Sequence, residues 1–341
     1  MVVGRLAGHH PLPGGLHVLD AILENKLLAA AVVVVVVPLV LIGYILLVEA
    51  ILRRVPRRLS PGLRPWLWLA PALTFLGVFL VYPTIATIFR SFQNRRGNDF
   101  VGLENYEWFF TQSDTLIALR NNALWVVLLP LFVVGLGLVV ALLVDRVRYE
   151  SVAKSIIFLP LAISFVAAAV IWKFLYDIDP NIGTFNAMVT AAGGDPVAWL
   201  QVQPWNNVFL IVVGVWLLTG FAMVILSAGL KGISTELLEA ARVDGANEAQ
   251  VFRRIILPLL MPTIAVVATT IVIYALKTFD VVYTMTNGNF NTDVIARLMY
   301  QELFNNGQPG RAAAVAVVLF LAIAPVMYLN IQRFREQEAL R

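Results

Sequence analysis

The chain has 341 residues, of which 60% are hydrophobic and 13% are charged, and it contains no cysteine. These proportions differ strongly from those of soluble proteins and indicate a polytopic membrane protein. The lack of cysteine excludes disulfides and thiolate metal sites. The formal net charge of +4 resides in short loops rather than on a basic face, which argues against nucleic acid as a partner.

Seven hydrophobic stretches are long enough to cross a hydrocarbon core of roughly 30 Å. In chain order they lie at about residues 27–52, 66–89, 122–144, 155–176, 207–229, 259–284 and 312–332. The first is too long for the apolar part of a signal peptide, and no basic segment precedes it, so we expect a retained span. A basic, proline-broken linker follows at 53–65. We therefore expect an N-terminal part at 1–60, with one appended span, and a core at 61–341.

The orientation of the spans follows from Lys and Arg in the connecting segments, because these residues resist translocation. One alternating set of segments contains 15 of them and the opposite set contains 8. The richer set is expected to face the cytoplasm, which places the N-terminus outside and the C-terminus inside. The long segment 177–206 contains neither Lys nor Arg, as expected for an extracytoplasmic loop.

The polar loop at 231–258, between the fifth and sixth spans, has the pattern of a helix, a tight turn and a second helix. Ser234 can cap a short helix over residues 235–243. Gly245 can end that helix, because glycine accepts the left-handed conformation that a helix end commonly needs. Asn247 can then cap a second helix that leads into the sixth span.

The fixed positions of this loop are Glu-Ala-Ala, three residues, Gly, nine residues and Ile-x-Leu-Pro. This pattern closely resembles the cytoplasmic loop of permease subunits of binding-protein-dependent ABC importers. In that family the first short helix is the coupling helix, which docks into a cleft on an ATPase subunit. The resemblance implies that coupling to the ATPase is carried by Glu239, Ala240, Ala241, Asp244, Gly245, Ile255, Leu257 and Pro258.

Other segments resemble the sugar-type permeases of this family, over about residues 66–335. The segment 102–106 is similar to their Gly-Leu-x-Asn-Tyr element. Where the family usually has a Gly-Gly-Gly-Pro-like turn, the segment 285–290 departs at Asn289 and Phe290. The resemblance implies an all-α, polytopic helical membrane protein in a prokaryotic inner membrane. It has a type I importer permease core of about six spans plus one extra N-terminal span.

The resemblance also implies a set of partners. These are a second homologous permease, two ATPase subunits and an extracytoplasmic sugar-binding protein, with membrane lipid around the spans. The sequence contains no Gly-x-x-x-x-Gly-Lys-Ser/Thr loop. ATP and magnesium are therefore expected on the partner subunits, and this chain is expected to be a transport subunit with no catalytic site, metal site or cofactor of its own.

Polar and aromatic side chains within the fifth and sixth spans are candidate substrate contacts, because polar groups are costly in a bilayer. A sugar requires aromatic faces for its C–H groups and hydrogen-bonding groups for its hydroxyls. Residues 274, 277 and 278 have the i, i+3, i+4 spacing of one helix face. The candidates for the substrate pathway are Trp216, Thr219, Phe221, Tyr274, Lys277 and Thr278.

Structural roles remain open for several of these side chains. Trp216 can serve packing alone, and Lys277 can neutralise Asp280 at the i, i+3 spacing. Thr269 and Thr270 can return hydrogen bonds to their own helix.

The sequence thus favours an ATP-driven importer for sugars of the di- or oligosaccharide, α-glucoside type. A permease for a glycerol-phosphate-type substrate is an alternative, because Lys277 could meet a phosphate. An ion-driven secondary transporter is less favoured, because the sequence shows no convincing repeat and only Asp280 as an acid well inside a core span. An intramembrane enzyme is least favoured, because the spans contain no histidine or cysteine.

The charge asymmetry generates a test of topology. Reporter fusions at Gly14 and after Arg341 should report opposite sides of the membrane, because an odd number of spans separates them. Two reporters on the cytoplasmic side would contradict seven spans and would indicate that the first stretch is re-entrant around Pro38 or Gly43.

Overall fold

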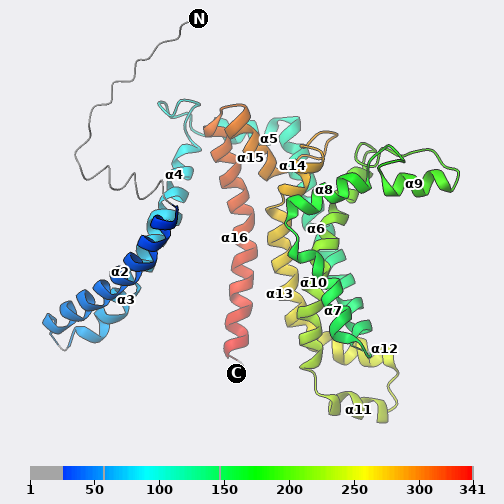
Figure 1. Cartoon of the computed structure of the whole chain (residues 1–341), viewed down its shortest axis with the longest axis horizontal. Helices are drawn as coiled ribbons and strands as arrows, with labels where there is room; N and C mark the ends of the chain where they lie inside the picture. Colours follow the sequence, from blue (N-terminus) through cyan, green and yellow to red (C-terminus); the bar gives the residue numbers. More distant parts are fainter. Residues whose placement is uncertain (1–25, 57, 146, 340–341) are drawn as a thin grey trace, which may run out of the picture. The chain divides into compact units, whose positions relative to one another are not determined.

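The computed structural model describes residues 26–56, 58–145 and 147–339. In these residues every secondary-structure element of more than an isolated bridge is a helix, which confirms the all-α prediction (Figure 1). The helices are α2 (Lys26–Arg54), α3 (Ser60–Leu76), α4 (Tyr82–Arg90), α5 (Glu104–Thr111), α6 (Ser113–Val144), α7 (Glu150–Phe158), α8 (Phe165–Leu175), α9 (Thr184–Ala191), α10 (Trp205–Lys231), α11 (Thr235–Val243), α12 (Glu248–Val251), α13 (Leu257–Leu276), α14 (Asp280–Met285), α15 (Ile295–Tyr300) and α16 (Pro309–Ala339). Single π-helical turns lie at Gly77–Val81, Phe252–Ile256 and Gln301–Asn305.

Among the described residues, six helical segments are long and apolar enough to cross a membrane, and a bent helix pair can make a seventh span. This agrees with the predicted core of about six spans and one additional span. The expected extracytoplasmic tail before Lys26 lies outside the described residues.

The chain divides into two compact units, at residues 1–83 and 84–341. In the first unit, α2 packs on α3. Tyr44 donates a hydrogen bond to the carbonyl of Leu67, and Arg64 forms a 3.0 Å ion pair with Glu49. The valine run of α2 is helical despite its β-branched side chains, because in lipid the backbone must satisfy its own hydrogen bonds. The boundary of this unit falls within the second hydrophobic stretch, whereas the division at residue 60 followed the linker and the family resemblance.

The core of the second unit is a packed group of three helices, α6, α10 and α13. Its fully buried side chains include Trp125 and Leu129 from α6, Leu218 and Met223 from α10, and Ile271 from α13. α10 is the central helix, since α6, α7, α8 and α13 all contact it.

The span predicted at about 155–176 is a bent pair of helices rather than one straight helix. α7 runs into a 3₁₀ turn at Leu159–Ala162, and α8 then leaves at 97°. Pro160 lacks a backbone donor and cannot continue the α-helical ladder. Ser164 starts the new helix, because its hydroxyl accepts a 3.2 Å hydrogen bond from the backbone of Ala167.

The sixth predicted span also ends early, at Leu276 rather than near residue 284, and α14 begins separately at Asp280. The side chain of Asn122 in α6 donates hydrogen bonds to the carbonyls of Ala275, at 3.4 Å, and Leu276, at 3.2 Å. The last carbonyls of a helix have no partner within it. These bonds satisfy two of them and so stabilise the end of α13 at this point.

The two ends of the second unit carry different structures. α9, α14 and α15 lie at one end, and α11 lies at the opposite end (Figure 1). The element at 102–106 belongs to the first end. Asn105 is buried there and donates to the carbonyls of Ser91, at 2.9 Å, and Gln93, at 3.0 Å, while the hydroxyls of Tyr106 and Ser91 are 2.6 Å apart. The element therefore fixes the loop that precedes α5.

The contact between the broken span and α10 can be tested by a glycine substitution. A Cβ atom on Gly220 would lie 2.5 Å from the carbonyl oxygen of Ile157 and 2.7 Å from the Cα atom of Phe158. We expect Gly220→Ala to destabilise the protein by about 1–3 kcal/mol, because backbone atoms must move to admit the methyl group. Thermal unfolding of the purified permease in detergent measures this loss.

Gly135→Ala in α6 is the matched control, because nothing lies within 4 Å of the added methyl group. Equal unfolding temperatures for the two variants would contradict the close approach at Gly220.

Candidate functional site: the cytoplasmic loop and the cavity between the spans

The loop at 231–258 folds as the sequence indicates. α11 covers Thr235–Val243, and Asn247 caps α12 in a reciprocal pair of 2.9 Å bonds with Gln250. Ser234 occupies the N-cap position of α11, but its side chain makes no capping hydrogen bond. The predicted helices are confirmed, and the predicted side-chain cap by Ser234 is wrong.

The turn between the two short helices depends on Gly245. Its φ angle is +85°, in the left-handed region that glycine occupies without strain. The backbone N–H groups of Gly245 and Ala246 donate to the carbonyls of Arg242 and Ala241, each at 3.0 Å. This pair of bonds is a Schellman motif, which satisfies the end of α11 and turns the chain sharply.

An ion pair across this turn links the two helices. Arg242 Nε lies 2.8 Å from Glu248 Oε1. The hydrogen bond that Arg242 donates to Glu248 raises the pKa of the Arg242 guanidinium above its usual range.

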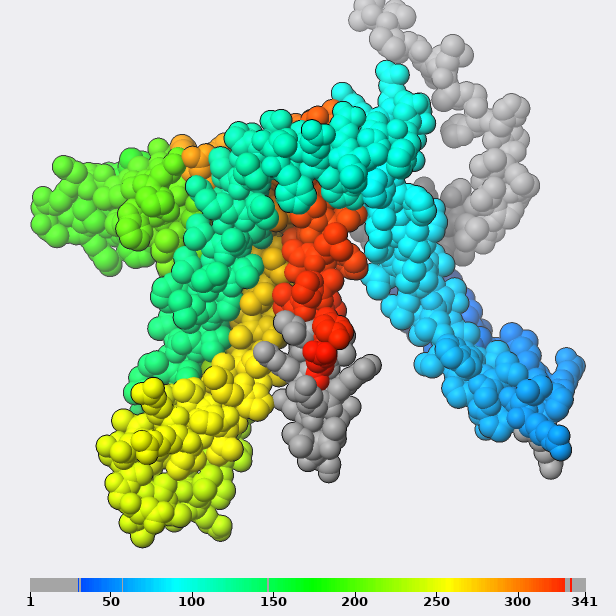
Figure 2. Space-filling view, turned by 180° about the vertical axis from the view of Figure 1, so that it is seen from behind, coloured from blue at the N-terminus to red at the C-terminus, as the bar shows by residue number. Residues whose placement is uncertain are grey.

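The surface of α11 is fully accessible in this chain. None of its residues is buried, and Leu237 and Val243 are 46% and 87% exposed. Figure 2 shows this segment as the free end of the second unit. A nine-residue helix is marginal by itself, and its exposed apolar side chains indicate a docking surface. Glu239 is also exposed and accessible to a partner.

The second part of the motif leads directly into the membrane. Ile255 belongs to the π-helical turn Phe252–Ile256, and Leu257 and Pro258 begin α13. Pro258 has no backbone N–H to donate, which fits a locally widened helix at this point.

Ionic contacts tie the start of this loop to the neighbouring helices. Lys154 of α7 forms ion pairs with Asp145, at 2.9 Å, and Glu150, at 2.5 Å, and contacts Ser227 near the end of α10. Lys231, the last residue of α10, forms a 2.5 Å ion pair with the same Glu150. The end of α10 and the start of α7 are thereby linked beside the loop.

A cavity of about 440 Å³ lies between the spans, at the break between α13 and α14. Its walls combine aromatic rings with hydrogen-bonding and charged groups. The lining residues are Trp125, Leu129, Phe165, Gly214, Leu218, Thr270, Ile273, Tyr274, Lys277, Thr278, Phe279, Asp280 and Val281.

Two aromatic residues give this cavity its chemical character. The ring of Tyr274 stacks on Phe165, with centroids 6.0 Å apart. Trp125 is 1% exposed, and its indole N–H has no acceptor in the described chain. A buried donor without a partner is costly, so a ligand oxygen in the cavity could supply the missing hydrogen bond.

The structure brings part of the predicted substrate set together. Tyr274, Lys277 and Thr278 line the cavity, but they do not share one helix face, because α13 ends before Lys277. That part of the prediction is wrong. Lys277 and Asp280 both line the cavity and, although both are described, form no ion pair with each other.

Three of the candidates, Trp216, Thr219 and Phe221, are not among the residues that line the cavity. Trp216 packs edge-on against Trp172, with centroids 5.8 Å apart, and Phe221 packs against the apolar core. The hydroxyls of Thr219, Thr269 and Thr270 donate to carbonyls of their own helices, at 2.5–2.9 Å. A role for Trp216, Thr219 and Phe221 along the substrate pathway stays a prediction.

Three aromatic lining residues were not predicted from the sequence: Trp125, Phe165 and Phe279. Trp125 gave no signal, because it lies three residues inside the span predicted at 122–144, where tryptophan is expected at the membrane interface. Within the described residues, no group of three or more His, Cys, Asp or Glu side chains is placed to hold a metal ion.

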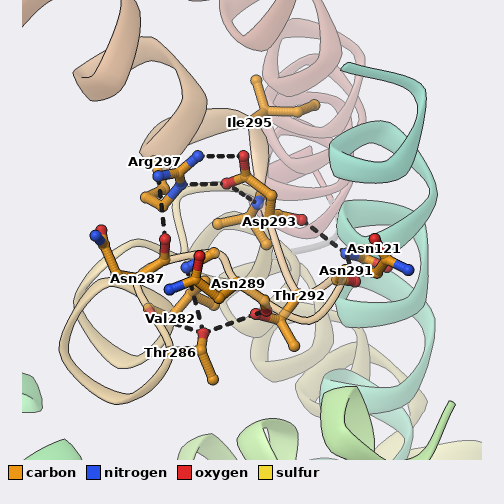
Figure 3. Close-up of polar contacts among 12 residues, drawn as sticks. Asn121, Val282, Thr286, Asn287, Asn289, Asn291, Thr292, Asp293, Ile295 and Arg297 are labelled. Carbon is orange, nitrogen blue, oxygen red and sulfur yellow. Dashed lines mark hydrogen bonds and ion pairs between the residues drawn. The ribbon is translucent and has the colours of Figure 1, made fainter. Parts of the chain in front are cut away.

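The loop that follows α14 forms a hydrogen-bonded unit at the opposite end from α11 (Figure 3). The hydroxyls of Thr286 and Thr292 are 2.7 Å apart. Arg297 binds both carboxylate oxygens of Asp293 and donates to the carbonyl of Asn287 at 3.1 Å. Asn121 of α6 donates to two further carbonyls of this loop. The loop is therefore fixed from both sides.

Comparisons with known proteins agree with this architecture. A family model described as "Binding-protein-dependent transport system inner membrane component" matches residues 133–336. The chain is therefore a member of this family, as a multi-pass permease subunit of an ABC importer in the inner membrane, without catalytic activity of its own.

Relatives with printed descriptions span most of the chain. The osmoprotective compounds uptake permease protein GgtC of Synechocystis sp. is 53% identical over 279 residues, covering 81% of this chain and 100% of that protein. The alpha-glucoside transport system permease protein AglF of Rhizobium meliloti is 48% identical over 280 residues, covering 81% and 83%. A crystal structure of a bacterial ABC transporter involved in the import of alginate matches 82% of this chain and 99% of that chain, with 26% identity and a TM-score of 0.71.

Proposed function

We propose that this permease imports a neutral sugar of the α-glucoside type, delivered by an extracytoplasmic binding protein. The cavity beside the break in α13 carries this proposal. Its volume of about 440 Å³ is within the range of small-molecule sites. The description of AglF as an alpha-glucoside permease supports the same substrate class, and GgtC is described as a permease for osmoprotective compounds.

The cavity offers both kinds of contact that a sugar needs. Tyr274 and Phe279 present aromatic rings to its C–H faces. The indole of Trp125 donates a hydrogen bond, Thr278 donates or accepts, Lys277 donates and Asp280 accepts. Hydroxyl groups can satisfy all of these at once, because each hydroxyl is both a donor and an acceptor.

The charges in the cavity favour a neutral substrate over a glycerol-phosphate-type one. Lys277 would attract a phosphate, but Asp280 lines the same cavity and would repel it. Because these two side chains do not neutralise each other directly, both remain free to bind hydroxyls of a neutral ligand.

Coupling would pass through the loop at 231–258. In the proposed complex, α11 docks on one of two ATPase subunits, which bind ATP and magnesium, and a second homologous permease completes the membrane pathway. Closure of the ATPase pair would pull α11, and the ion pairs of Lys154 and Lys231 would carry that motion to α7 and α10.

The substrate assignment predicts a graded loss of transport. Tyr274→Ala removes a stacking face, and Trp125→Phe removes one hydrogen-bond donor while keeping a ring. Each change should weaken the interaction by about 1 kcal/mol, or roughly fivefold. Uptake of radiolabelled maltose or trehalose by proteoliposomes with the binding protein, measured across sugar concentrations, tests this.

Trp216→Phe is the control, because Trp216 does not line the cavity. Wild-type concentration dependence in both cavity variants would place the sugar elsewhere. A loss in Trp216→Phe alone would favour the fifth span as the site.

The coupling assignment predicts a separate phenotype. Glu239→Lys reverses a charge on the exposed face of α11, and Gly245→Val places a β-branched residue at positive φ. Both changes should lower ATPase activity stimulated by the loaded binding protein by roughly tenfold, or about 1.4 kcal/mol. The permease should still reach the membrane, because the apolar spans are unchanged. The measurement is stimulated ATP hydrolysis in reconstituted complexes, per amount of permease.

Asp195→Lys provides the matched charge reversal on the extracytoplasmic loop, where it should leave stimulation unchanged. Full stimulation in both loop variants would show that this loop does not transmit the signal.

A further inference from the structure

A second, larger cavity lies outside the membrane pathway, at the end of the second unit that carries α5, α14 and α15. Its volume is about 650 Å³, and it shares no lining residue with the cavity at the α13 break. The loop 287–291 forms one wall, the start of α6 another, and the π-helical turn Gln301–Asn305 a third. Nothing in the proposed transport path uses these residues.

The lining of this outer cavity is dominated by amides. Seven of its eighteen lining residues are Asn or Gln, more than all of its acidic and basic residues together. Carboxamides both donate and accept hydrogen bonds, as hydroxyl groups do. Phe290 lines the same cavity with 45% of its surface exposed, which leaves an aromatic face for C–H groups.

Glu302 in the lining has an unsatisfied carboxylate oxygen. The residue is 4% exposed, and Oε1 accepts a 2.6 Å hydrogen bond from Asn306. Oε2 is buried and has no partner in the described chain. Because this oxygen is not exposed to the cavity, the exposed amides of the lining, rather than Glu302, supply the contacts that are open to a ligand.

The wall at 287–291 is held in a strained shape. Asn287, Phe290 and Asn291 have φ angles of 50°, 58° and 61°, which non-glycine residues rarely adopt. The surrounding side chains impose this shape, as Figure 3 shows for the bonds from Asn121 and Arg297. Asn206 of α10 also donates to the carbonyl of Phe290 at 2.8 Å. Strain maintained in this way is typical of functional sites and presents a preorganised surface.

The charges of the cavity select among ligand classes. Asp293 and Arg297 neutralise each other, and Arg311 lies over the ring of Trp108, 4.7 Å from its centroid. A cationic ligand would meet Arg311, and an anionic ligand would meet Glu302 and Asp114. A neutral ligand with many hydroxyls avoids both penalties and satisfies the exposed amides.

We propose that this outer cavity is a second binding site, for a neutral polyhydroxylated molecule such as a sugar or polyol, in addition to the site between the spans. The inference rests on the proposed function, because its test uses the assembled transporter complex. At this end of the permease the site would hold a ligand before it enters the membrane pathway.

The test is equilibrium dialysis of radiolabelled maltose and trehalose against the assembled transporter in nanodiscs, without the binding protein. The variant Asn289→Ala with Asn305→Ala removes two exposed amides of the lining and leaves the buried contacts intact. We expect two saturable binding components in the wild type, one for each cavity, and a weakening of at least tenfold in one of them in this double variant. Asn98→Ala, an exposed amide outside the cavity, should retain both components, and Tyr274→Ala should weaken only the component that the double variant retains.

Competition with choline and with inorganic phosphate tests the ligand class, and neither should displace the sugar. The inference is overturned if fewer than two saturable components occur, if the double variant retains both components, or if Tyr274→Ala weakens both of them. It is also overturned if the double variant weakens only the affinity for the binding protein, since the cavity would then accept a protein side chain. Sugar uptake by the complete transporter is scored separately: uptake without outer binding refutes this site alone, and absence of sugar uptake refutes the proposed substrate.

Discussion

Every break in a membrane-spanning helix frees backbone groups that lipid cannot satisfy, and this constraint organises the second unit. Asn122 of α6 satisfies backbone groups of this kind at the break between α13 and α14. Its amide group donates to the last carbonyls of α13, and its carbonyl oxygen accepts a 2.7 Å hydrogen bond from the backbone of Ile295. One buried side chain therefore fixes the end of α13 and the start of α15. The cavity between the spans lies beside this break, with Trp125 one helical turn further along α6.

α10 connects the two ends of the same unit. At one end Asn206 and Asn207 hold the loop after α14, and in the middle Gly220 admits the broken fourth span. At the other end Ser227 and Lys231 join the ion pairs beside the cytoplasmic loop. A rigid helix with contacts at both ends is a physical route by which a pull on α11 could reach the sugar site. Because other segments contact α10 along its length, small residues on α10 are needed for close packing.

The local features of the coupling loop were predictable because they depend on neighbours in sequence. Helix α11, the capping by Asn247 and the turn at Gly245 all follow from residue types within a few positions of each other. The number of apolar spans followed from composition, since a bilayer of fixed thickness requires stretches of fixed length. Ser234 shows the limit even here, because a suitable residue at the N-cap did not make the capping bond.

The sequence by itself determined that this chain crosses a membrane several times and carries a short helix on a polar loop, because hydrophobic length and turn chemistry act locally. Only the tertiary structure decided where the spans break and what surrounds each break. Asn122 meets Ala275 and Leu276 from more than 150 positions away, and no local pattern announces that contact. The same applies to the outer cavity, whose walls come from α6, the loop after α14 and the turn at 301–305. Side chains that satisfy another segment's backbone are selected by packing in three dimensions, so their partners become visible only in the fold.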